Sequence, residues 1–288
     1  MPSIDALNWE HLRVFLATMR TGSLRAAADS LKLSHPTARR RLGALEEQLG
    51  LQLFERRRDG LHPTVEADAL HTAAEEVERA VHALGRIAQA ADPALRGPIR
   101  VTAPDIVGTE LLMPDFAVFQ RRWPDIDLRV DVSYQVADLD KREADVAIRA
   151  LPAGNLPAQH LTGRKAATSY QAVYGEGEAW IGWQGEALDR PWIRATAFPD
   201  LPIRGGFNDP VLQRGACAAG LGLSMLPCFY AEPMLKRRSK PRPHFDLWVL
   251  VHPDLRRSPR LRVFRDFIVD ALKRHRARLE GLPETATD

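Results

Sequence analysis

Apolar residues at helical spacing predict two short helices at the start of the chain. The first ends at Thr21-Gly22 and carries Leu12, Phe15, Leu16 and Met19 on one face. The second covers Leu24–Leu31 with Ser23 as its N-cap, and its alanines at 26–28 allow another helix to pack closely. This pattern indicates a small all-α unit.

A third helix is predicted after the short turn at 32–34. Ser34 is placed to cap this helix, Pro36 lies in its first turn and Gly50 ends it. A helix, a tight turn and a second helix that begins with arginines form the geometry that reads the major groove of DNA. Residues 54–61 then combine three arginines with an Asp59-Gly60 turn signal, which predicts a basic hairpin wing.

A long helix is predicted from Thr64 to about Ala91, with Pro63 before it and Pro93 after it. Its apolar residues recur at alternating intervals of four and three: Leu70, Ala74, Val77, Val81, Leu84, Ala88 and Ala91. This spacing is the heptad of a helix–helix seam and differs from the 3.6-residue period of a core-facing helix. The sequence therefore predicts a dimer through this helix, and the alternative is a helix packed on its own domain.

Strands and helices alternate from Ile99 onward. Strands are expected at 99–103, 126–133, 146–148, 166–174, 180–183, 203–207, 221–226 and 245–251. Helices are expected at 108–122, 138–142, 209–219 and 259–278. This alternation predicts a mostly parallel α/β sheet.

The overall charge hides an uneven distribution. The 288 residues suit two domains, and 45% apolar residues support sizeable buried cores. A net charge of +3 conceals two basic ends, with ten basic and seven acidic residues in 1–63 and fourteen and seven in 236–288. The first excess coincides with the predicted DNA-reading helix. The second indicates a solvated helix face, with a contact to the acidic long helix or to bent DNA as alternatives.

Several classes of protein are disfavoured by the sequence. Cys217 and Cys228 are too few for a disulfide framework, which favours a reducing cytoplasm. The first residues lack a signal-peptide pattern, and the longest uncharged stretch, 215–231, is shorter than the ~20 residues of a membrane helix. Nucleotide, hydrolase and metalloprotease motifs are missing, so we expect no enzyme, no metal, no cofactor and no membrane contact.

Landmarks along nearly the whole chain resemble the LysR-type transcriptional regulators. Those of the DNA-binding end and of the linker helix are Ala26-Ala27-Ala28, Ser34-His35-Pro36-Thr37, Arg40, Leu45-Glu46, Leu49-Gly50, Leu53-Phe54-Glu55-Arg56 and Pro63-Thr64-Val65-Glu66-Ala67. Those of the effector domain are Gly97-Pro98-Ile99-Arg100-Val101, Leu111-Leu112-Met113-Pro114, residues 143–149, residues 219–227 and Leu247-Trp248-Val249-Leu250.

The resemblance implies an α/β protein with an all-α winged helix-turn-helix N-terminal domain. It implies this DNA-binding domain at 1–63, a linker helix for dimerisation at 64–92 and an effector domain at 99–280. The effector domain would be similar to periplasmic binding proteins and consist of two α/β subdomains. The first would be 99–159 plus 243–280 and the second 160–242, which is short for the family.

The implied function is sequence-specific regulation of transcription. A dimer or tetramer would bind double-stranded promoter DNA, and a small-molecule effector in the cleft between the subdomains would modulate that binding. Two alternatives remain open from the residues. One is an architectural DNA-binding regulator without an effector, and the other is a redox sensor that uses its cysteines.

The family pattern places the DNA contacts on the third helix and the wing. The expected contact residues are Ser34, His35, Pro36, Thr37, Arg39, Arg40, Arg56, Arg57 and Arg58. Arg39, Arg40 and Arg41 fan over about 200° of the helix, so all three cannot enter one groove. His35 stands where glutamine is common, so the usual half-site of the family is not assumed. The alternative for these residues is an ordinary solvated surface.

The effector site is expected on loops after the predicted strands. Its candidate residues are Pro104, Asp105, Ile106, Arg149, Asn208 and Asp209. Many relatives carry a hydroxyl at the first loop to hold an effector carboxylate, whereas this chain has Asp105, which would repel an anion and attract an amine or a guanidinium. The alternative is that Asp105 caps the next helix. Trp183 and Phe207 could contact an aromatic effector, although core positions are the simpler interpretation.

Overall fold

The computed structural model describes residues 7–58, 60–132, 138–183, 193–232 and 234–283. The chain divides into two compact units, residues 1–85 and 86–288, which are described separately. The boundary falls within a long helix, α4 (Val65–Ala91), so most of this helix belongs to unit 1 and its last residues to unit 2.

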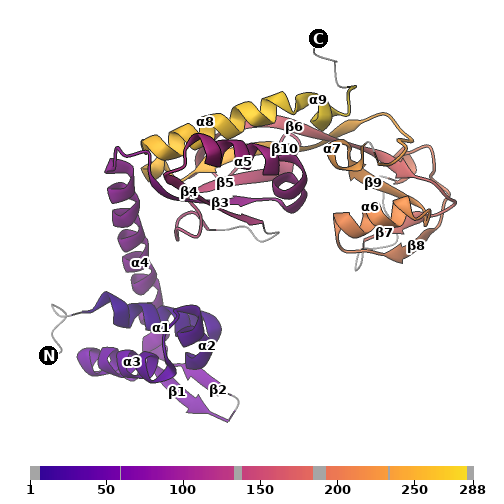
Figure 1. The fold of residues 1–288 in the computed structure, drawn as a ribbon. Coiled ribbons are helices and arrows are strands. Elements are labelled where there is room, and N and C mark those ends of the chain that lie inside the picture. Colours follow the sequence, from indigo (N-terminus) through magenta and orange to yellow (C-terminus); the bar gives the residue numbers. More distant parts are fainter. Residues whose placement is uncertain (1–6, 59, 133–137, 184–192, 233, 284–288) are drawn as a thin grey trace. The chain divides into compact units, whose positions relative to one another are not determined.

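Unit 1 begins with the three predicted helices, α1 (Trp9–Thr21), α2 (Leu24–Ser30) and α3 (His35–Leu49), shown in indigo and violet in Figure 1. The side chains of Ser23 and Ser34 accept a hydrogen bond from a backbone N–H in the first turn of α2 and α3. Gly22 and Gly50 end α1 and α3 with φ of 64° and 65°. The predicted caps and stops are confirmed, since these local hydrogen bonds need no distant residue.

The wing is an antiparallel pair of strands, β1 (Phe54–Arg57) and β2 (Gly60–Pro63). The Glu46 carboxylate on α3 accepts the Leu53 N–H at 2.8 Å, and the Thr64 hydroxyl donates to the Gln52 carbonyl oxygen at 2.8 Å. Both ends of the hairpin are therefore tied to the helices around it. Asp59 of the predicted turn lies outside the described residues.

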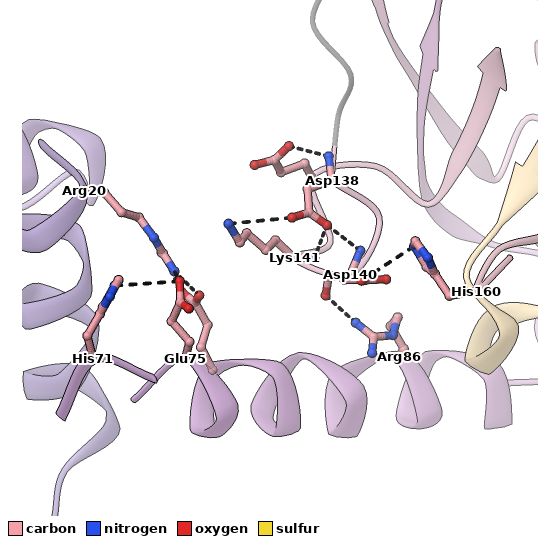
Figure 2. Close-up of polar contacts among 10 residues, drawn as sticks. Arg20, His71, Glu75, Arg86, Asp138, Asp140, Lys141 and His160 are labelled. Carbon is pink, nitrogen blue, oxygen red and sulfur yellow. Dashed lines mark hydrogen bonds and ion pairs between the residues drawn. The ribbon is translucent and has the colours of Figure 1, made fainter. Parts of the chain in front are cut away.

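Helix α4 packs its first turns into the core of unit 1. Ala67 and Ala74 are buried with Phe15, Leu45 and Leu53 in one apolar cluster. The Arg20 guanidinium on α1 pairs with the carboxylates of Glu78 and Glu75 on α4, and His71 approaches Glu75 (Figure 2). This hydrogen-bonded pairing with Glu78 raises the pKa of Arg20, so an ionic tie supplements the apolar contact.

Unit 2 is built on one mixed sheet with the strand order β4-β3-β5-β10-β6-β9-β7-β8 (Figure 1). The strands are β3 (Gly97–Ala103), β4 (Ile126–Val132), β5 (Val146–Pro152), β6 (Thr162–Gly175), β7 (Trp180–Gly182), β8 (Ile203–Gly206), β9 (Leu223–Pro227) and β10 (Arg242–Val251). The helices are η2 (Val107–Leu111), α5 (Met113–Arg122), η3 (Ile193–Ala195), α6 (Pro210–Ala218), α7 (Cys228–Ala231), η4 (Pro253–Leu255), α8 (Pro259–Arg274) and α9 (Arg276–Glu280).

The sheet is parallel at its two ends and antiparallel in the middle. β3 pairs in parallel with β4 and β5, and β7 pairs in parallel with β8 and β9. Between them β10 runs antiparallel to both β5 and β6, and β6 runs antiparallel to β9. Two long strands thus join two α/β halves, each with its own apolar core. Phe229 and Tyr230 of α7 pack in the first of these cores.

Some predicted helices differ from the structure. Residues 138–142 form turns and not a helix, because the Asp138 carboxylate accepts the N–H groups of Asp140 and Lys141 and Arg142 is left-handed at φ 59°. The predicted helix 108–122 is two elements, since η2 gives way to α5 at Leu112, two residues before Pro114. The last predicted helix breaks at His275 into α8 and α9.

In the residues that the structure describes, no helix combines the length and apolar character needed to cross a bilayer.

Candidate functional site

The N-terminus of α3 presents an exposed polar surface on unit 1. Ser34, His35 and Pro36 are exposed, Thr37 is half-buried, and the hydroxyls of Ser34 and Thr37 are 2.8 Å apart. Ser34 is therefore engaged as the cap of α3, while the His35 ring and the Pro36 ring face outward. Ala38, directly after them, is fully buried in the unit 1 core.

The three consecutive arginines of α3 have different environments. Arg39 and Arg40 are exposed, whereas Arg41 is half-buried and donates to the Glu10 carboxylate on α1 at 2.8 Å. Hydrogen bonding to Arg13 and the charges of Arg13 and Arg41 hold the pKa of Glu10 below its ordinary value. Two of the three guanidinium groups thus remain at the surface of α3.

The wing carries three further exposed arginines, Arg56, Arg57 and Arg58. Arg56 and Arg57 are successive residues of β1, so their side chains leave opposite faces of the hairpin. Arg57 also contacts Glu55 at 3.3 Å in an exposed pair.

The turn between α2 and α3 adds a cation that the sequence pattern did not single out. Lys32 is exposed and adopts a left-handed conformation with φ of 56°. Side chains rarely occupy this region, and glycine is the usual residue there. A lysine in the turn before a DNA-reading helix is suited to contact a phosphate, and its position in the sequence could have indicated this.

The apolar residues of α4 in unit 1 separate into two faces. Leu70 and Ala74 of the predicted seam pack against the core of unit 1. Val77 and Leu84 are 45% and 69% exposed, and Ala73 and Ala80 are exposed at intervening positions. We call Ala73, Val77, Ala80 and Leu84 the α4 stripe, and its spacing of four, three and four is again that of a heptad.

The same spacing continues along α4 beyond unit 1. Ile87 and Ala91 are exposed at the next two heptad positions. Val81 and Ala88 of the predicted seam are not on this heptad line. Val81 is half-buried and Ala88 is exposed. Of the predicted seam, Leu70 and Ala74 thus pack in the core of unit 1, Val77, Leu84 and Ala91 lie on an exposed apolar line, and Val81 and Ala88 belong to neither.

The effector candidates of the first loop lie between β3 and η2. Pro104 and Asp105 are half-buried and Ile106 is buried. Ile106 is the N-cap residue of η2, which has no side-chain cap, so Asp105 is not the N-cap of this helix. Asp209 is the N-cap of α6 and accepts the N–H groups of Val211 and Leu212 at 2.7 and 3.2 Å.

Asp105 and Asp209 both act on Tyr230 of α7, which sequence reasoning did not include. Burial raises the pKa of the Tyr230 hydroxyl, Arg214 lowers it, and the carboxylates of Glu110, Asp209 and Asp105 raise it further. We call these five residues the Tyr230 cluster. The Arg214 guanidinium stacks over the Tyr230 ring at 3.9 Å, donates to the Tyr230 carbonyl at 3.1 Å and lies 3.7 Å from Glu110.

The Tyr230 cluster has an excess of negative charge and an unsatisfied donor. It contains three carboxylates and one guanidinium, and Tyr230 is only 1% exposed. The Tyr230 hydroxyl is buried without a hydrogen-bond partner. A buried polar group in this state is costly unless a ligand or water reaches it.

The remaining effector candidates are less enclosed or lie on another strand. Asn208 is exposed and directly precedes Asp209, the N-cap of α6. Arg149 is half-buried on β5 opposite Trp248 of β10, and burial lowers the pKa of its guanidinium. Phe207 packs in the second core, whereas Trp183 is half-buried after β7.

The two cysteines are buried thiols of the second core. Cys217 is 4% exposed and Cys228 is fully buried. Burial raises the pKa of Cys217 to about 11 and also raises that of Cys228. Because the thiolate is the reactive form, neither thiol has the environment of a redox sensor.

Two family models match the chain and together cover most of it. The model described as "Bacterial regulatory helix-turn-helix protein, lysR family" matches residues 9–68. The model described as "LysR substrate binding domain" matches residues 93–174 and 156–273.

Relatives of known role are similar over different shares of the chain. An HTH-type transcriptional regulator of Xanthomonas campestris pv. campestris is 30% identical over 90% of this chain and 84% of its own length. The transcriptional activator protein LysR of Escherichia coli is 38% identical, over 43% of this chain and 40% of its own length. The regulator CrgA of Neisseria meningitidis is 26% identical over 92% of this chain and 97% of its own length.

Solved structures share the fold over nearly the whole chain. A full-length OxyR variant from Pseudomonas aeruginosa has a TM-score of 0.60 at 19% identity and covers 98% of this chain and 99% of its own. The full-length Vibrio cholerae virulence activator AphB has a TM-score of 0.56 at 21% identity, with 92% and 99% covered. The chain therefore belongs to the LysR family, whose members are transcription regulators with a helix-turn-helix DNA-binding domain and an effector-binding domain and are not enzymes.

Proposed function

We propose that this regulator binds promoter DNA through the exposed start of α3, with the wing on the phosphate backbone. The observation that supports this best is that only some residues of α3 are buried or paired, while others are exposed on one face. Ala38 is buried and Arg41 pairs with Glu10, which leaves His35, Arg39 and Arg40 exposed on the remaining face. A recognition helix needs such a face, because base edges in the major groove are read by exposed donors.

The DNA-binding form is a homodimer that associates through the α4 stripe. Exposed Val77 and Leu84 are apolar side chains on a heptad spacing, and a heptad seam gains stability from a second helix. Leu70 and Ala74 are occupied by the core of unit 1. The protein acts in the cytoplasm, where the DNA of a bacterium lies.

The effector that modulates DNA binding carries a cationic group, and it binds at the Tyr230 cluster. Three carboxylates against one guanidinium favour an amine or a guanidinium over a simple carboxylate. The Tyr230 hydroxyl has no hydrogen-bond partner and is available to an acceptor on the effector. An architectural regulator without an effector is the alternative.

DNA binding is tested with the DNA upstream of the gene itself. The protein is expected to retard this DNA in a gel, and Arg40→Ala is expected to weaken retardation. Arg121→Ala, which removes an exposed arginine from α5, is the matched control and is expected to bind like the parent. If the parent protein fails to retard the upstream DNA, the proposed regulation of this promoter is wrong. If Arg40→Ala binds equally well, the proposed placement of α3 is wrong.

Effector chemistry is tested by thermal unfolding with two matched panels. Small amines and guanidines form one panel, and small mono- and dicarboxylates form the other. A cationic compound is expected to raise the melting temperature, and Asp105→Asn should abolish the rise while Asp125→Asn, an exposed loop carboxylate, retains it. A rise that is confined to carboxylates contradicts the cationic assignment, and a lack of any rise supports the architectural alternative.

A further inference from the structure

A second charged site lies in unit 2, away from the Tyr230 cluster. A pocket of about 230 Å³ is lined by arginines from four separate segments. Arg100 comes from β3, Arg129 from β4, Arg142 from the turn before β5 and Arg260 from the first turn of α8. Asp105 follows the carboxyl end of β3, so the arginine pocket lies toward the other end of this strand.

The sheet itself brings two of these cations together. Arg100 and Arg129 are register partners on the parallel strands β3 and β4, so their side chains leave the same face of the sheet. Like charges on directly adjacent strand positions repel each other. Such a pair is expected where a negative group compensates it.

The carboxylate that lines the pocket is already occupied. Asp145 is 2% exposed and accepts the Arg100 N–H at 2.8 Å, the Arg100 guanidinium at 3.3 Å and the Gln89 amide at 3.3 Å. At the rim, Arg129 pairs with Asp127 in an exposed contact of 2.6 Å. Four arginines and one aspartate therefore line the pocket, and the carboxylates that pair with Arg129 and Arg260 lie outside this lining.

Two guanidinium groups of the pocket have unused hydrogen-bond donors. The Nε atoms of Arg142 and Arg260 are both buried without a hydrogen-bond partner. Arg260 is 7% exposed, and its contact with Asp92 has the long distance of 3.5 Å. Arg142 donates to the neutral Gln89 amide at 3.1 Å. Buried donors of charged groups are costly to leave unpaired, so these N–H groups await an acceptor.

The backbone at Arg142 is held in an unfavourable conformation. Its φ of 59° lies in the left-handed region, which side chains other than glycine, asparagine and aspartate rarely adopt. Burial and the charge of Arg100 lower the pKa of this guanidinium. Strained residues of this kind persist where surrounding contacts fix them, and they concentrate at ligand clamps.

We propose that the arginine pocket binds a tetrahedral oxyanion, either inorganic phosphate or the phosphoryl group of a metabolite. A tetrahedral anion offers acceptor oxygens in several directions, which suits guanidinium groups that arrive from different elements. Gln89 lies near the end of α4 and also lines the pocket, so the bound anion stabilises the end of this helix on unit 2. Arg86, one turn earlier, donates to the Asp254 carboxylate and to the Asp140 carbonyl oxygen, and Figure 2 shows the contact with Asp140.

The test is titration of the full-length protein with phosphate at constant ionic strength, with chloride as the reference salt. Isothermal titration calorimetry is expected to show one site per chain, and the melting temperature is expected to rise by at least about 2 °C at saturation. Arg142→Asn keeps a residue that tolerates the left-handed backbone and is expected to abolish both effects. Arg129→Gln, at an exposed position on the rim, is expected to lower the affinity for phosphate at least about five-fold and to leave the fold intact.

A control variant and a second ligand distinguish inorganic phosphate from a phosphorylated metabolite. Arg121→Gln removes an exposed arginine outside the pocket and should bind phosphate like the parent. Tighter binding of glycerol phosphate than of inorganic phosphate identifies a phosphorylated metabolite, and the reverse identifies the free ion. The proposal is overturned if phosphate has no larger effect than chloride, or if Arg129→Gln and Arg142→Asn bind phosphate like the parent. It is also overturned if duplex DNA binds to these arginines and phosphate does not.

Discussion

Arg41 of α3 donates a hydrogen bond to Glu10 of α1 at 2.8 Å. The last arginine of the 39–41 triplet therefore makes a contact within the DNA-binding domain. Arg39 and Arg40 precede it on the same helix, but their side chains are exposed. The helix period separates them, because successive residues are rotated by about 100°.

The exposed and the paired arginine of α3 should respond differently to truncation. Arg40→Ala should weaken binding to the target DNA by about 1–3 kcal/mol if its guanidinium reads a base edge. Arg41→Ala should leave the contacts with DNA in place and lower the unfolding free energy by at most about 1 kcal/mol, since Glu10 is partly exposed and the pair is screened. Fluorescence anisotropy and thermal unfolding measure the two effects. Equal losses of affinity in both variants would sink the assignment.

The wing should contribute to affinity through one of its two strand arginines more than the other. Arg56 and Arg57 leave opposite faces of β1, so one of them faces the backbone of bound DNA. The slope of log affinity against log salt should become less negative by about 0.9 when Gln replaces that residue, and should barely change when Gln replaces the other. Anisotropy titrations over a range of salt concentrations measure both slopes. Two identical slope changes would contradict the predicted orientation of the wing.

Charge placed on the α4 stripe should dissociate the dimer. Leu84→Glu and Val77→Glu each put a carboxylate on an exposed apolar position of the heptad, where it would be buried against the partner helix. Arg79→Glu is the matched control, because Arg79 is exposed on another face of α4 and only pairs weakly with Glu76 at 3.7 Å. Sedimentation velocity should show monomers for the first two variants and dimers for the control. Unchanged dimers of Leu84→Glu would exclude the stripe as the interface.

Acid should destabilise unit 2 through His244. Burial, with a smaller contribution from the charge of Arg242, lowers the pKa of His244 to about 4 from an ordinary value of 6.5. The unfolded chain therefore binds a proton between these values while the folded chain does not, so stability is complete above pH 6.5 and is lost as the pH falls toward 4. Denaturant unfolding at several pH values should show this loss, and His244→Gln should flatten the curve in that window. A curve with the same slope in the variant would assign the loss to other groups.

The cysteines should be inert in the folded protein. Cys217 has a pKa of about 11 and both thiols are buried, so little thiolate is available at about pH 8. Iodoacetamide should modify the denatured chain at least about ten-fold faster than the folded one. Hydrogen peroxide should change DNA binding no more in the parent than in a Cys217→Ser/Cys228→Ser variant. Loss of DNA binding on peroxide treatment that the double variant resists would restore the redox alternative.

On α4, the sequence predicts the helix but does not predict which of its apolar residues are buried. Pro63, Pro93 and the apolar spacing predict the helix, and it is present as Val65–Ala91. The spacing alone could not show which apolar residues meet the protein's own core. Leu70 and Ala74 lie in the core of unit 1, and the exposed stripe includes Ala73 and Ala80, which the predicted seam did not contain.

The effector region shows the same limit more strongly. Asp105 and Asp209 are predictable from loops that follow strands, but Tyr230, Arg214 and Glu110 are not. These three residues lie on α7, α6 and η2, and they reach one another only because the sheet brings the elements together. The arginine pocket likewise joins segments that are far apart in the sequence, from the end of α4 to the start of α8.

The sequence by itself determined most of the helices, the caps of α2 and α3, most of the strands, the basic character of the DNA-reading helix and the family. These properties depend on residues within a few positions of each other, where hydrogen bonds and apolar periodicity act locally. The tertiary structure decided which charged and apolar side chains remain available. It committed Arg41 to Glu10, gathered carboxylates at Tyr230 and placed four arginines around one occupied aspartate. The reason is physical: burial and pairing decide whether a side chain is free to bind, and both arise from contacts between distant parts of the chain.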